Sequence, residues 1–391
     1  MSLRREGRHH ARAAKTKVRD KSRRCAVSGS ILVTGGAGFI GSHTCKALAA
    51  EGFVPVAFDD LSRGHAACVR WGPLVQGDIL DPAALEAAFE RYRPSAVVHF
   101  AALAYVGESA QRPLAYYRTN VAGLINVLDA MARFGSGAIV FSSSCATYGI
   151  PASLPVAEDA PQRPISPYGR SKLACEHILA DVAAACGLRV ACLRYFNAAG
   201  ADPQRELVER HEPETHLIPL AIDAATGQAP PLPLLGTDYP TADGTCERDF
   251  VHVCDLAWAH VAALRQLQSG DASLTLNLGS GRASSVRRAI AAVERITARK
   301  VPTRIAARRP GDPPILVADI SAARRRIGFE PRLSDLDVIV ETAWRSRTAE
   351  SRERTMSAPH PGPLSRARIS PTSADGTSAD GTSADGTSAD A

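Results

Sequence analysis

The stretch ILVTGGAGFIG, residues 31–41, decides the fold. Its first part, Ile31 to Thr34, is a short apolar strand, and a glycine-rich turn follows directly, before a helical stretch from Ser42 to Ala50. A glycine turn between a strand and a helix is the context in which a helix N-terminus binds the pyrophosphate of a dinucleotide. The stretch therefore predicts a dinucleotide-binding α/β fold.

The glycines of this turn have separate expected roles. Gly35 makes the tight turn, Gly38 lets the backbone approach a pyrophosphate, and Gly41 allows close packing of the helix on the strand. The intervening residues Phe39 and Ile40 are included among the predicted cofactor contacts. The spacing is G-x-x-G-x-x-G, and the alternative interpretation is a structural turn that binds no phosphate.

A second apolar strand, residues 54–58, ends in Asp59 and Asp60, about 20 residues after the glycine turn. An acid at this place binds the adenosine ribose hydroxyls and repels a 2′-phosphate. We therefore predict that the cofactor is NAD and not NADP.

Further cofactor contacts are predicted at the ends of the next two strands. Asp78 and Ile79 follow a strand-like stretch, and Asp78 is expected to face the adenine. The strand 96–100 ends in Phe100, and the small residues Ala101 and Ala102 after it leave room for a cofactor. His99 within this strand is interpreted as a core histidine with a hydrogen-bond partner.

A tyrosine and a lysine lie four residues apart in YGRSK, residues 168–172, on one face of a predicted helix. A free phenol has a pKa of about 10, and a nearby cation lowers it, so Lys172 is expected to make Tyr168 a base for a sugar hydroxyl. Ser144 follows the buried strand 138–141, at a carboxyl end where such sheets bind ligands. The alternative for Tyr168 and Lys172 is an ordinary surface pair.

The helix that contains Tyr168 is expected to pair with an earlier one. Residues 113–134 are predicted to be helical, with Asn120 pointing toward the sheet, and residues 168–185 form the second helix. The apolar face of the first is assigned to Leu114, Tyr117, Val121, Leu124 and Leu128. The outer faces of the two helices could form the four-helix contact of a homodimer.

Strands alternate with helices up to residues 190–193, which predicts a doubly wound parallel sheet. The predicted parts are a disordered basic extension (1–28), a Rossmann-type NAD-binding domain (29–193), a smaller α/β substrate domain with returning segments (194–346) and a disordered low-complexity tail (347–391). The tail repeats Thr-Ser-Ala-Asp-Gly, which cannot bury apolar surface. Arginines on separate loops of the smaller domain, Arg248 and Arg309, suit a diphosphate.

Composition excludes several classes of protein. The chain has 391 residues and no apolar run long enough for a membrane span. Its nine cysteines contain no C-x-x-C pair and suggest a reducing compartment, with neither a disulfide framework nor a zinc site, so no metal is predicted. The net charge of +6 arises in residues 1–30, which carry +8. That extension is interpreted as solvated and disordered, with a nucleic-acid or membrane-surface arm and an organelle-targeting peptide as alternatives.

With these residues assembled, the chain from about Ile31 to Trp344 resembles the extended short-chain dehydrogenase/reductase family and, within it, the UDP-glucose 4-epimerase family. The motifs that carry the resemblance are TGGAGFIGSHTC, GDI at Gly77, VGES at Val106, FSSSCATYG at Phe141, SPYGRSKL at Ser166, LRYFNAAGA at Leu193, DYPTADGTCERDFVHV at Asp238 and RRPGD at Arg308.

The resemblance implies a role for each matching residue. Ser144 would orient the substrate, Tyr168 would be the base, and Lys172 would contact the nicotinamide ribose and tune the base. Asn120 would support the catalytic helix, and Tyr195 would lie by the nicotinamide. The implied contacts to the uridine diphosphate sugar are Asn197, His216, Leu217, Arg248, Arg309 and Asp312.

The implied activity is inversion of C4 of a UDP-hexose, UDP-glucose or UDP-galactose, through a transient 4-keto sugar with hydride returned from bound NADH. The expected enzyme is a cytoplasmic homodimer that binds neither nucleic acid nor membrane. Ala104 stands where a lysine can occur in the family, and His216 where asparagine is frequent. The alternatives are epimerases of UDP-pentose, UDP-glucuronate or UDP-N-acetylhexosamine, a net-redox dehydrogenase or reductase, and a non-catalytic NAD-sensing protein.

Overall fold

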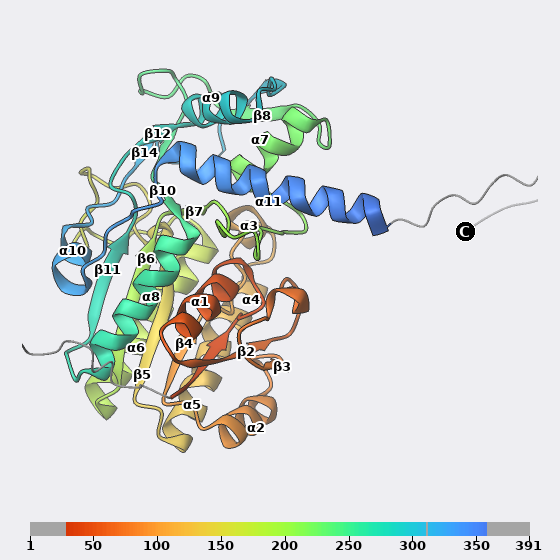
Figure 1. Ribbon diagram of the computed structural model, residues 1–391. Coiled ribbons are helices and arrows are strands. Elements are labelled where there is room, and N and C mark those ends of the chain that lie inside the picture. The colour runs from red at the N-terminus through yellow and green to blue at the C-terminus, as the bar shows by residue number, and fades with distance from the viewer. Residues whose placement is uncertain (1–28, 310–311, 358–391) are drawn as a thin grey trace, which may run out of the picture. The chain divides into compact units, whose positions relative to one another are not determined.

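Seven parallel strands form the central sheet, in the order β11-β6-β5-β4-β1-β2-β3 (Figure 1). Their bounds are β1 (Ser30–Thr34), β2 (Val54–Asp59), β3 (Leu74–Gln76), β4 (Ala96–His99), β5 (Ala138–Ser144), β6 (Arg189–Tyr195) and β11 (Leu274–Leu278). The strand order reverses at β1, which lies between β2 and β4. The predicted doubly wound parallel sheet is confirmed.

This computed structural model describes residues 29–309 and 312–357. The described residues up to Glu350 belong to one compact unit, whereas residues 351–357 belong to a second. The basic extension 1–28 and the repeats of the tail, which the sequence analysis interpreted as disordered, lie outside the described residues.

Helices cover both faces of the sheet and bury alternate residues of each strand. On one face, which is toward the viewer in Figure 1, Ile31 and Val33 pack with α1 (Phe39–Ala50) and α8 (Val253–Gln268). On the other face, Leu32 packs with a separate core that includes residues of α2, α5 and α6. The bounds of these helices are α2 (Pro82–Tyr92), α5 (Gly123–Phe134) and α6 (Pro167–Cys186). Apolar side chains on both faces are expected for strands of a parallel sheet.

The predicted helix 113–134 is interrupted by a π-helical turn. It consists of α4 (Pro113–Tyr116), the π segment η2 (Tyr117–Ala122) and α5. The wider turn shifts the helix face, so Leu114 and Tyr117 do not share the buried face of Leu124 and Leu128. Leu114 is 73% exposed and Tyr117 is 37% exposed, whereas Tyr116 is buried.

Beyond β6 the chain forms shorter strands and a third core, although α8 and β11 return to the large sheet. Three small sheets pair β7 (Asn197–Ala199) with β10 (Phe250–His252), β9 (Glu247–Arg248) with both β12 (Ser284–Ser285) and β14 (Ile315–Leu316), and β8 (Leu232–Leu235) with β13 (Thr303–Ala306). The third core includes residues of α7 (Leu217–Thr226), α9 (Val286–Thr297) and α11 (Leu336–Ser357). The remaining short helices are α3 (Val106–Gln111), α10 (Ser321–Ile327), η1 (Ala66–Cys68) and η3 (Cys145–Thr147).

The end of α11 corrects one expectation. This helix continues to Ser357, so residues 347–357 are helical and do not belong to an unstructured tail. Every cysteine in the described part of the chain is a free thiol. Among the described helices, none has the length and apolar character that crossing a membrane requires.

Candidate active site

The carboxyl ends of the central strands bring the predicted site residues to one edge of the sheet. Because all seven strands are parallel, the glycine turn after β1, residues 100–102 after β4 and Ser144 at the end of β5 share this edge. The register pairs Thr34 with His99, and the Thr34 hydroxyl lies 2.8 Å from His99 Nδ1. His99 is buried with this partner, which confirms its interpretation as a core histidine.

The glycine turn can accommodate a pyrophosphate. Gly35 has φ +70°, and a Cβ there would lie 2.7 Å from the Ala101 backbone nitrogen, while a Cβ at Gly41 would lie 2.1 Å from the Gly35 oxygen. A Cβ at Gly38 would instead meet only the Gly35 oxygen among the described atoms, at 3.3 Å. Gly38 is the N-cap of α1, which has no side-chain cap, so the first N–H groups can bind an anion.

Asp59 lies beside this turn and is fixed by two backbone N–H groups. Its Oδ2 accepts a hydrogen bond from Ala37 at 3.0 Å, and its Oδ1 accepts one from Leu61 at 2.9 Å. Burial raises the pKa of the Asp59 carboxyl, although both hydrogen bonds favour the ionised form. Asp60 is exposed, and its Oδ1 accepts from the N–H and hydroxyl of Ser62. Asp59 is thus the better placed of the two acids for a ribose.

The other predicted cofactor contacts differ in exposure. Asp78 is exposed, and its Oδ1 accepts a hydrogen bond from the Leu80 N–H at 2.8 Å. Ile79 is buried and packs against Gly123 of α5, where a Cβ would lie 2.3 Å from its Cδ1. The residues after β4, namely Phe100, Ala101 and Ala102, are half-buried. Exposure at the sheet edge leaves Asp78 able to meet a ligand.

Tyr168 and Lys172 lie in the first turns of α6, which Ser166 caps through a hydrogen bond from the Gly169 N–H. Burial raises the pKa of Tyr168 to about 12, and a hydrogen bond with Ser144 acts in the opposite direction. Lys172 Nζ donates to the Ser142 carbonyl oxygen at 2.8 Å and lies 4.9 Å from the centre of the Phe141 ring. Burial lowers the pKa of Lys172 to about 8.

The pKa of Tyr168 is thus shifted in the direction opposite to the one that the sequence analysis expected, and the tuning of Tyr168 by Lys172 stays a prediction. Burial disfavours the charged form of each group and outweighs the other influences on Tyr168. Ser144 is the side chain that lowers the pKa of Tyr168, against the effect of burial, whereas Lys172 donates a hydrogen bond to a strand carbonyl.

Asn120 joins the loop after β4 to the catalytic helix. Its Oδ1 accepts from the Leu103 N–H at 2.8 Å, and its Nδ2 donates to the Leu103 oxygen at 3.0 Å and to the Ser171 hydroxyl at 2.9 Å. It lies in the π segment η2, and such turns are frequent at functional sites. These hydrogen bonds support the predicted role of Asn120, which is to hold α6 in position.

A buried ion pair, which the sequence analysis missed, also holds α6 to the sheet. Arg194 of β6 contacts both oxygens of Glu176 of α6, with Nη2 2.6 Å from Oε2 and Nε 2.9 Å from Oε1. Arg194 Nη1 donates to the Tyr148 hydroxyl at 2.8 Å, and the Ser143 hydroxyl donates to Glu176. A charged residue in an otherwise apolar strand was the available signal.

The predicted contacts to a diphosphate converge on one carboxylate. Arg248 Nη2 lies 3.5 Å from Asp312 Oδ1, and Arg309 Nε lies 4.0 Å from Asp312 Oδ2. Arg248 Nη1 also donates to the Pro313 oxygen at 2.9 Å. Asn197, at the start of β7, pairs in register with Phe250 of β10. The two guanidinium groups can therefore act on one ligand.

Three other predicted residues lie at the end of β6 and at the start of α7. Tyr195 ends β6, and its hydroxyl forms a hydrogen bond with the Ser142 hydroxyl on the neighbouring strand. His216 is the N-cap of α7, and its Nδ1 lies 2.8 Å from Glu214 Oε1. Leu217 is the first residue of α7 and is half-buried. An N–H group at this helix start could meet a phosphate.

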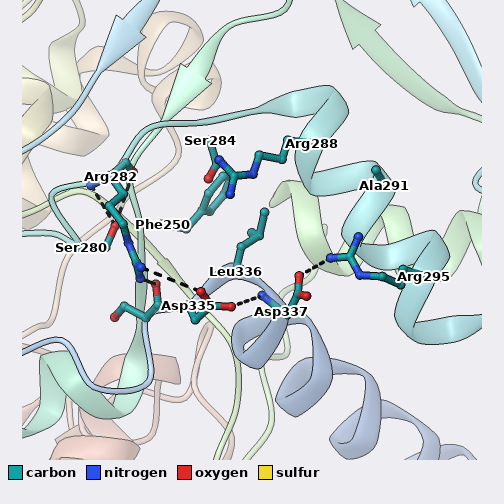
Figure 2. A pocket seen from close by; sticks show the side chains of 11 residues that line it. Phe250, Ser280, Arg282, Ser284, Arg288, Ala291, Arg295, Asp335, Leu336 and Asp337 are labelled. Atoms are coloured by element: carbon teal, nitrogen blue, oxygen red, sulfur yellow. Dashed lines mark hydrogen bonds and ion pairs between the residues drawn. The ribbon is translucent and has the colours of Figure 1, made fainter.

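A separate cavity of about 330 Å³ lies between α9 and the start of α11 (Figure 2). Two of its three arginines already have acidic partners, because Arg295 pairs with Asp337 and Arg282 Nη1 lies 3.9 Å from Asp335. None of the predicted site residues lines it, nor a second cavity of about 510 Å³ beside α10. The predicted chemistry belongs to the sheet edge.

Comparisons with known proteins agree with this geometry. The family described as "NAD dependent epimerase/dehydratase family" matches residues 31–279. A UDP-glucose 4-epimerase of Rhizobium meliloti (strain 1021) is 50% identical over 315 residues, 81% of this chain and 96% of that protein. One from Azospirillum brasilense is 48% identical over 319 residues, 81% of this chain and 92% of that protein.

Solved structures show the same likeness. The crystal structure of UDP-glucose 4-epimerase from Brucella ovis in complex with NAD has a TM-score of 0.80 and 53% identity, covering 81% of this chain and 98% of that one. The Bifidobacterium longum enzyme in complex with NAD+ and UDP has a TM-score of 0.79 and 34% identity, covering 82% of this chain and 99% of that one.

Proposed function

The chain belongs to the NAD dependent epimerase/dehydratase family, and from this premise we propose that it is an NAD-dependent isomerase that interconverts UDP-glucose and UDP-galactose by inverting C4. The observation that carries the proposal is that Tyr168, at the start of α6, and Ser144, at the end of β5, are both buried at the sheet edge that the glycine turn shares. A proton acceptor beside a dinucleotide cradle is what oxidation of a sugar hydroxyl requires.

The residues that would hold NAD fit such a group. Gly38 exposes the N-terminus of α1 to the pyrophosphate, and Asp59 is fixed beside it for the ribose. Phe39, Ile40 and Gly41 supply the first turn of that helix. When bound, NAD supplies a hydride acceptor that can give the hydride back, so the reaction has no net redox change.

The protein's own groups hold the sugar and move the proton. Ser144 orients the C4 oxygen, and Tyr168 takes the proton from the C4 hydroxyl and later returns it to the same oxygen. Arg248 and Arg309 hold the diphosphate by charge-assisted hydrogen bonds while the sugar turns to present its other face. Because these arginines would bind the diphosphate and not the hexose, the sugar itself stays free to turn.

We assign residues 29–193 to NAD binding and residues 194–346 to nucleotide-sugar binding, in agreement with the positions of the glycine turn and of Arg248. Free thiols throughout the described chain support a cytoplasmic location. We also assign a homodimer, because apolar side chains of the helices before α6 are exposed. These are Leu114, Tyr117 and Ile125.

The product spectrum from a panel of UDP-sugars tests the function. Purified protein with no added cofactor should convert UDP-glucose and UDP-galactose into each other without net formation of NADH. Faster turnover of a UDP-pentose, UDP-glucuronate or a UDP-N-acetylhexosamine would reassign the substrate. Consumption of added NAD in proportion to product would instead identify a net-redox dehydrogenase.

A further inference from the structure

Two carboxylates and two imidazoles meet in the segment that precedes α7. We call Glu209, His211, Glu214 and His216 the Glu/His cluster. One possible ligand atom from each of these residues lies within 4.8 Å of all the others. Cysteine spacing gave no reason to expect a metal here, because the cluster contains no cysteine. It shares His216 with the predicted substrate contacts and no residue with the catalytic group.

Three of the six separations within the Glu/His cluster are close to the edge length of a coordination tetrahedron, and all six are at most 4.8 Å. His211 Nδ1 lies 3.4 Å from Glu209 Oε1 and 3.5 Å from Glu214 Oε2. His216 Nδ1 lies 3.3 Å from Glu209 Oε1. Metal–ligand bonds of about 2.0–2.1 Å place tetrahedral ligand atoms roughly 3.3 Å apart. The four atoms can thus bind one ion with little movement.

The cluster is also incomplete as a hydrogen-bonded group. Glu209 is 3% exposed, and neither of its carboxylate oxygens accepts a hydrogen bond. Glu214 Oε2 and His211 Nδ1 are buried and equally without a hydrogen bond. A buried, ionised carboxylate without hydrogen bonds destabilises the folded state unless a positive charge compensates it.

The charges favour a divalent cation. With neutral imidazoles and ionised carboxylates the cluster carries a charge of about −2, which one divalent ion would cancel. Arg347 also acts on Glu209, but it pairs with Asp223, so its charge is shared. Glu214 Oε1 accepts from the N–H groups of Thr215 and His216, which orients the carboxylate as supporting hydrogen bonds do in metal sites.

We propose that Glu209, His211, Glu214 and His216 bind one divalent transition-metal ion of the Zn²⁺ class. Two imidazole nitrogens exclude a site built for Ca²⁺ or Mg²⁺, which prefer oxygen ligands. The ion ties residues 209–216 to the start of α7. It also holds His211 against the glycine turn, where its ring centre lies 5.9 Å from that of Phe39. The site is structural and takes no part in the proton transfer.

Titration of the full chain with Zn²⁺ tests the site. Protein freed of metal by a chelator should bind one Zn²⁺ per chain in calorimetry, and the metal should raise the melting temperature as a ligand of the folded state does. Glu209→Gln and His211→Ala should each raise the Kd for Zn²⁺ at least about tenfold and abolish the thermal shift. The exposed residues Glu90 and His177 provide the matched controls Glu90→Gln and His177→Ala. These variants should change neither the Kd for Zn²⁺ nor the thermal shift.

The absorption spectrum of bound Co²⁺ distinguishes metal binding at the Glu/His cluster from metal binding at the cysteines. Co²⁺ bound at the cluster should give tetrahedral d–d absorption without a thiolate charge-transfer band. Absence of Zn²⁺ binding, a thiolate band, or an unchanged Kd in Glu209→Gln would each overturn the proposal. Glu209→Gln preserves side-chain shape, so it decides the matter even where His211→Ala fails to fold.

Discussion

Burial governs the ionisation of the two groups nearest the proposed proton transfer. It raises the pKa of Tyr168 to about 12 and lowers that of Lys172 to about 8, so each side chain on its own tends toward neutrality. Opposite charges attract more strongly in a buried site than in water. A phenolate on Tyr168 and an ammonium on Lys172 therefore support each other, and loss of one charge should make the other less stable.

The roles of Tyr168 and Arg248 can be separated by substitution. Tyr168→Phe keeps the ring but removes the proton acceptor, so turnover should fall by about 10²–10⁴-fold, with UDP affinity little changed. Arg248→Ala should weaken UDP binding by about 1.5–3 kcal/mol, because a charge-assisted hydrogen bond is lost. Steady-state rates and UDP titrations measure both. Near-normal epimerisation by Tyr168→Phe would exclude Tyr168 as the base.

Lys172→Met should change the pH dependence of turnover. At pH 7 wild-type Lys172 is mostly protonated, because its pKa is about 8, and its charge favours the phenolate of Tyr168. The variant lacks that cation, so its rate should be low at pH 7 and rise as solvent base ionises Tyr168. The ratio of wild-type to variant rates should narrow above pH 8, where wild-type Lys172 also loses its charge. A ratio independent of pH between 6 and about 10 would show that Lys172 acts only by position.

At the scale of elements, the position of α6 depends on its contacts with segments that are distant in the sequence. Asn120 links it to the loop after β4, and Glu176 links it to Arg194 of β6. The helical spacing of Tyr168 and Lys172 was sufficient to predict α6. The π segment before α5 was not predicted, because the apolar spacing of residues 113–134 was interpreted as one continuous helix.

Breaking the buried ion pair between Arg194 and Glu176 should lower both the stability of the protein and its turnover. Glu176→Ala leaves the Arg194 guanidinium buried without its carboxylate, and loss of one partner of a buried pair costs about 3–5 kcal/mol. Urea unfolding measures this loss. Turnover should also fall, because α6 carries Tyr168. The exposed pair of Arg133 and Glu86 provides the control, since Glu86→Ala should cost less than about 1 kcal/mol. Equal losses in the two variants would contradict the anchoring role.

Over the whole molecule, the sequence predicted features that are local in the chain better than contacts between residues that are distant in it. Gly35, Gly38 and Asp59 were identifiable because the motif and the place of its helix are local. The meeting of Arg248 with Asp312 joins β9 to a distant loop, and no spacing in the chain encodes that distance. The E-x-H-x-x-E-x-H spacing of residues 209–216 was visible, but only the fold shows that its four side chains face one another.

Removing the chain ends should leave the catalytic unit intact. The Thr-Ser-Ala-Asp-Gly repeats and the basic extension have compositions that cannot contribute to a core. A variant that lacks residues 1–28 and 358–391 keeps all of α11 and should retain its turnover. Its Tm should change by less than about 2 °C, which corresponds to less than about 1 kcal/mol in a protein of this size. A larger loss in calorimetry would mean that an end packs against the fold.

The exposed apolar residues before α6 make the homodimer testable. Leu114 is 73% exposed and Ile125 is 42% exposed, and burying such a side chain in an interface contributes about 1.5–3 kcal/mol. The double variant Leu114→Glu/Ile125→Glu would place four carboxylates in a two-fold interface, so we expect monomers in sedimentation equilibrium and a Tm that no longer depends on protein concentration. Ile305 of β13 is 72% exposed on another element, and Ile305→Glu should remain dimeric. A dimer that survives the double variant would place the interface elsewhere, and a monomeric wild type would exclude the homodimer.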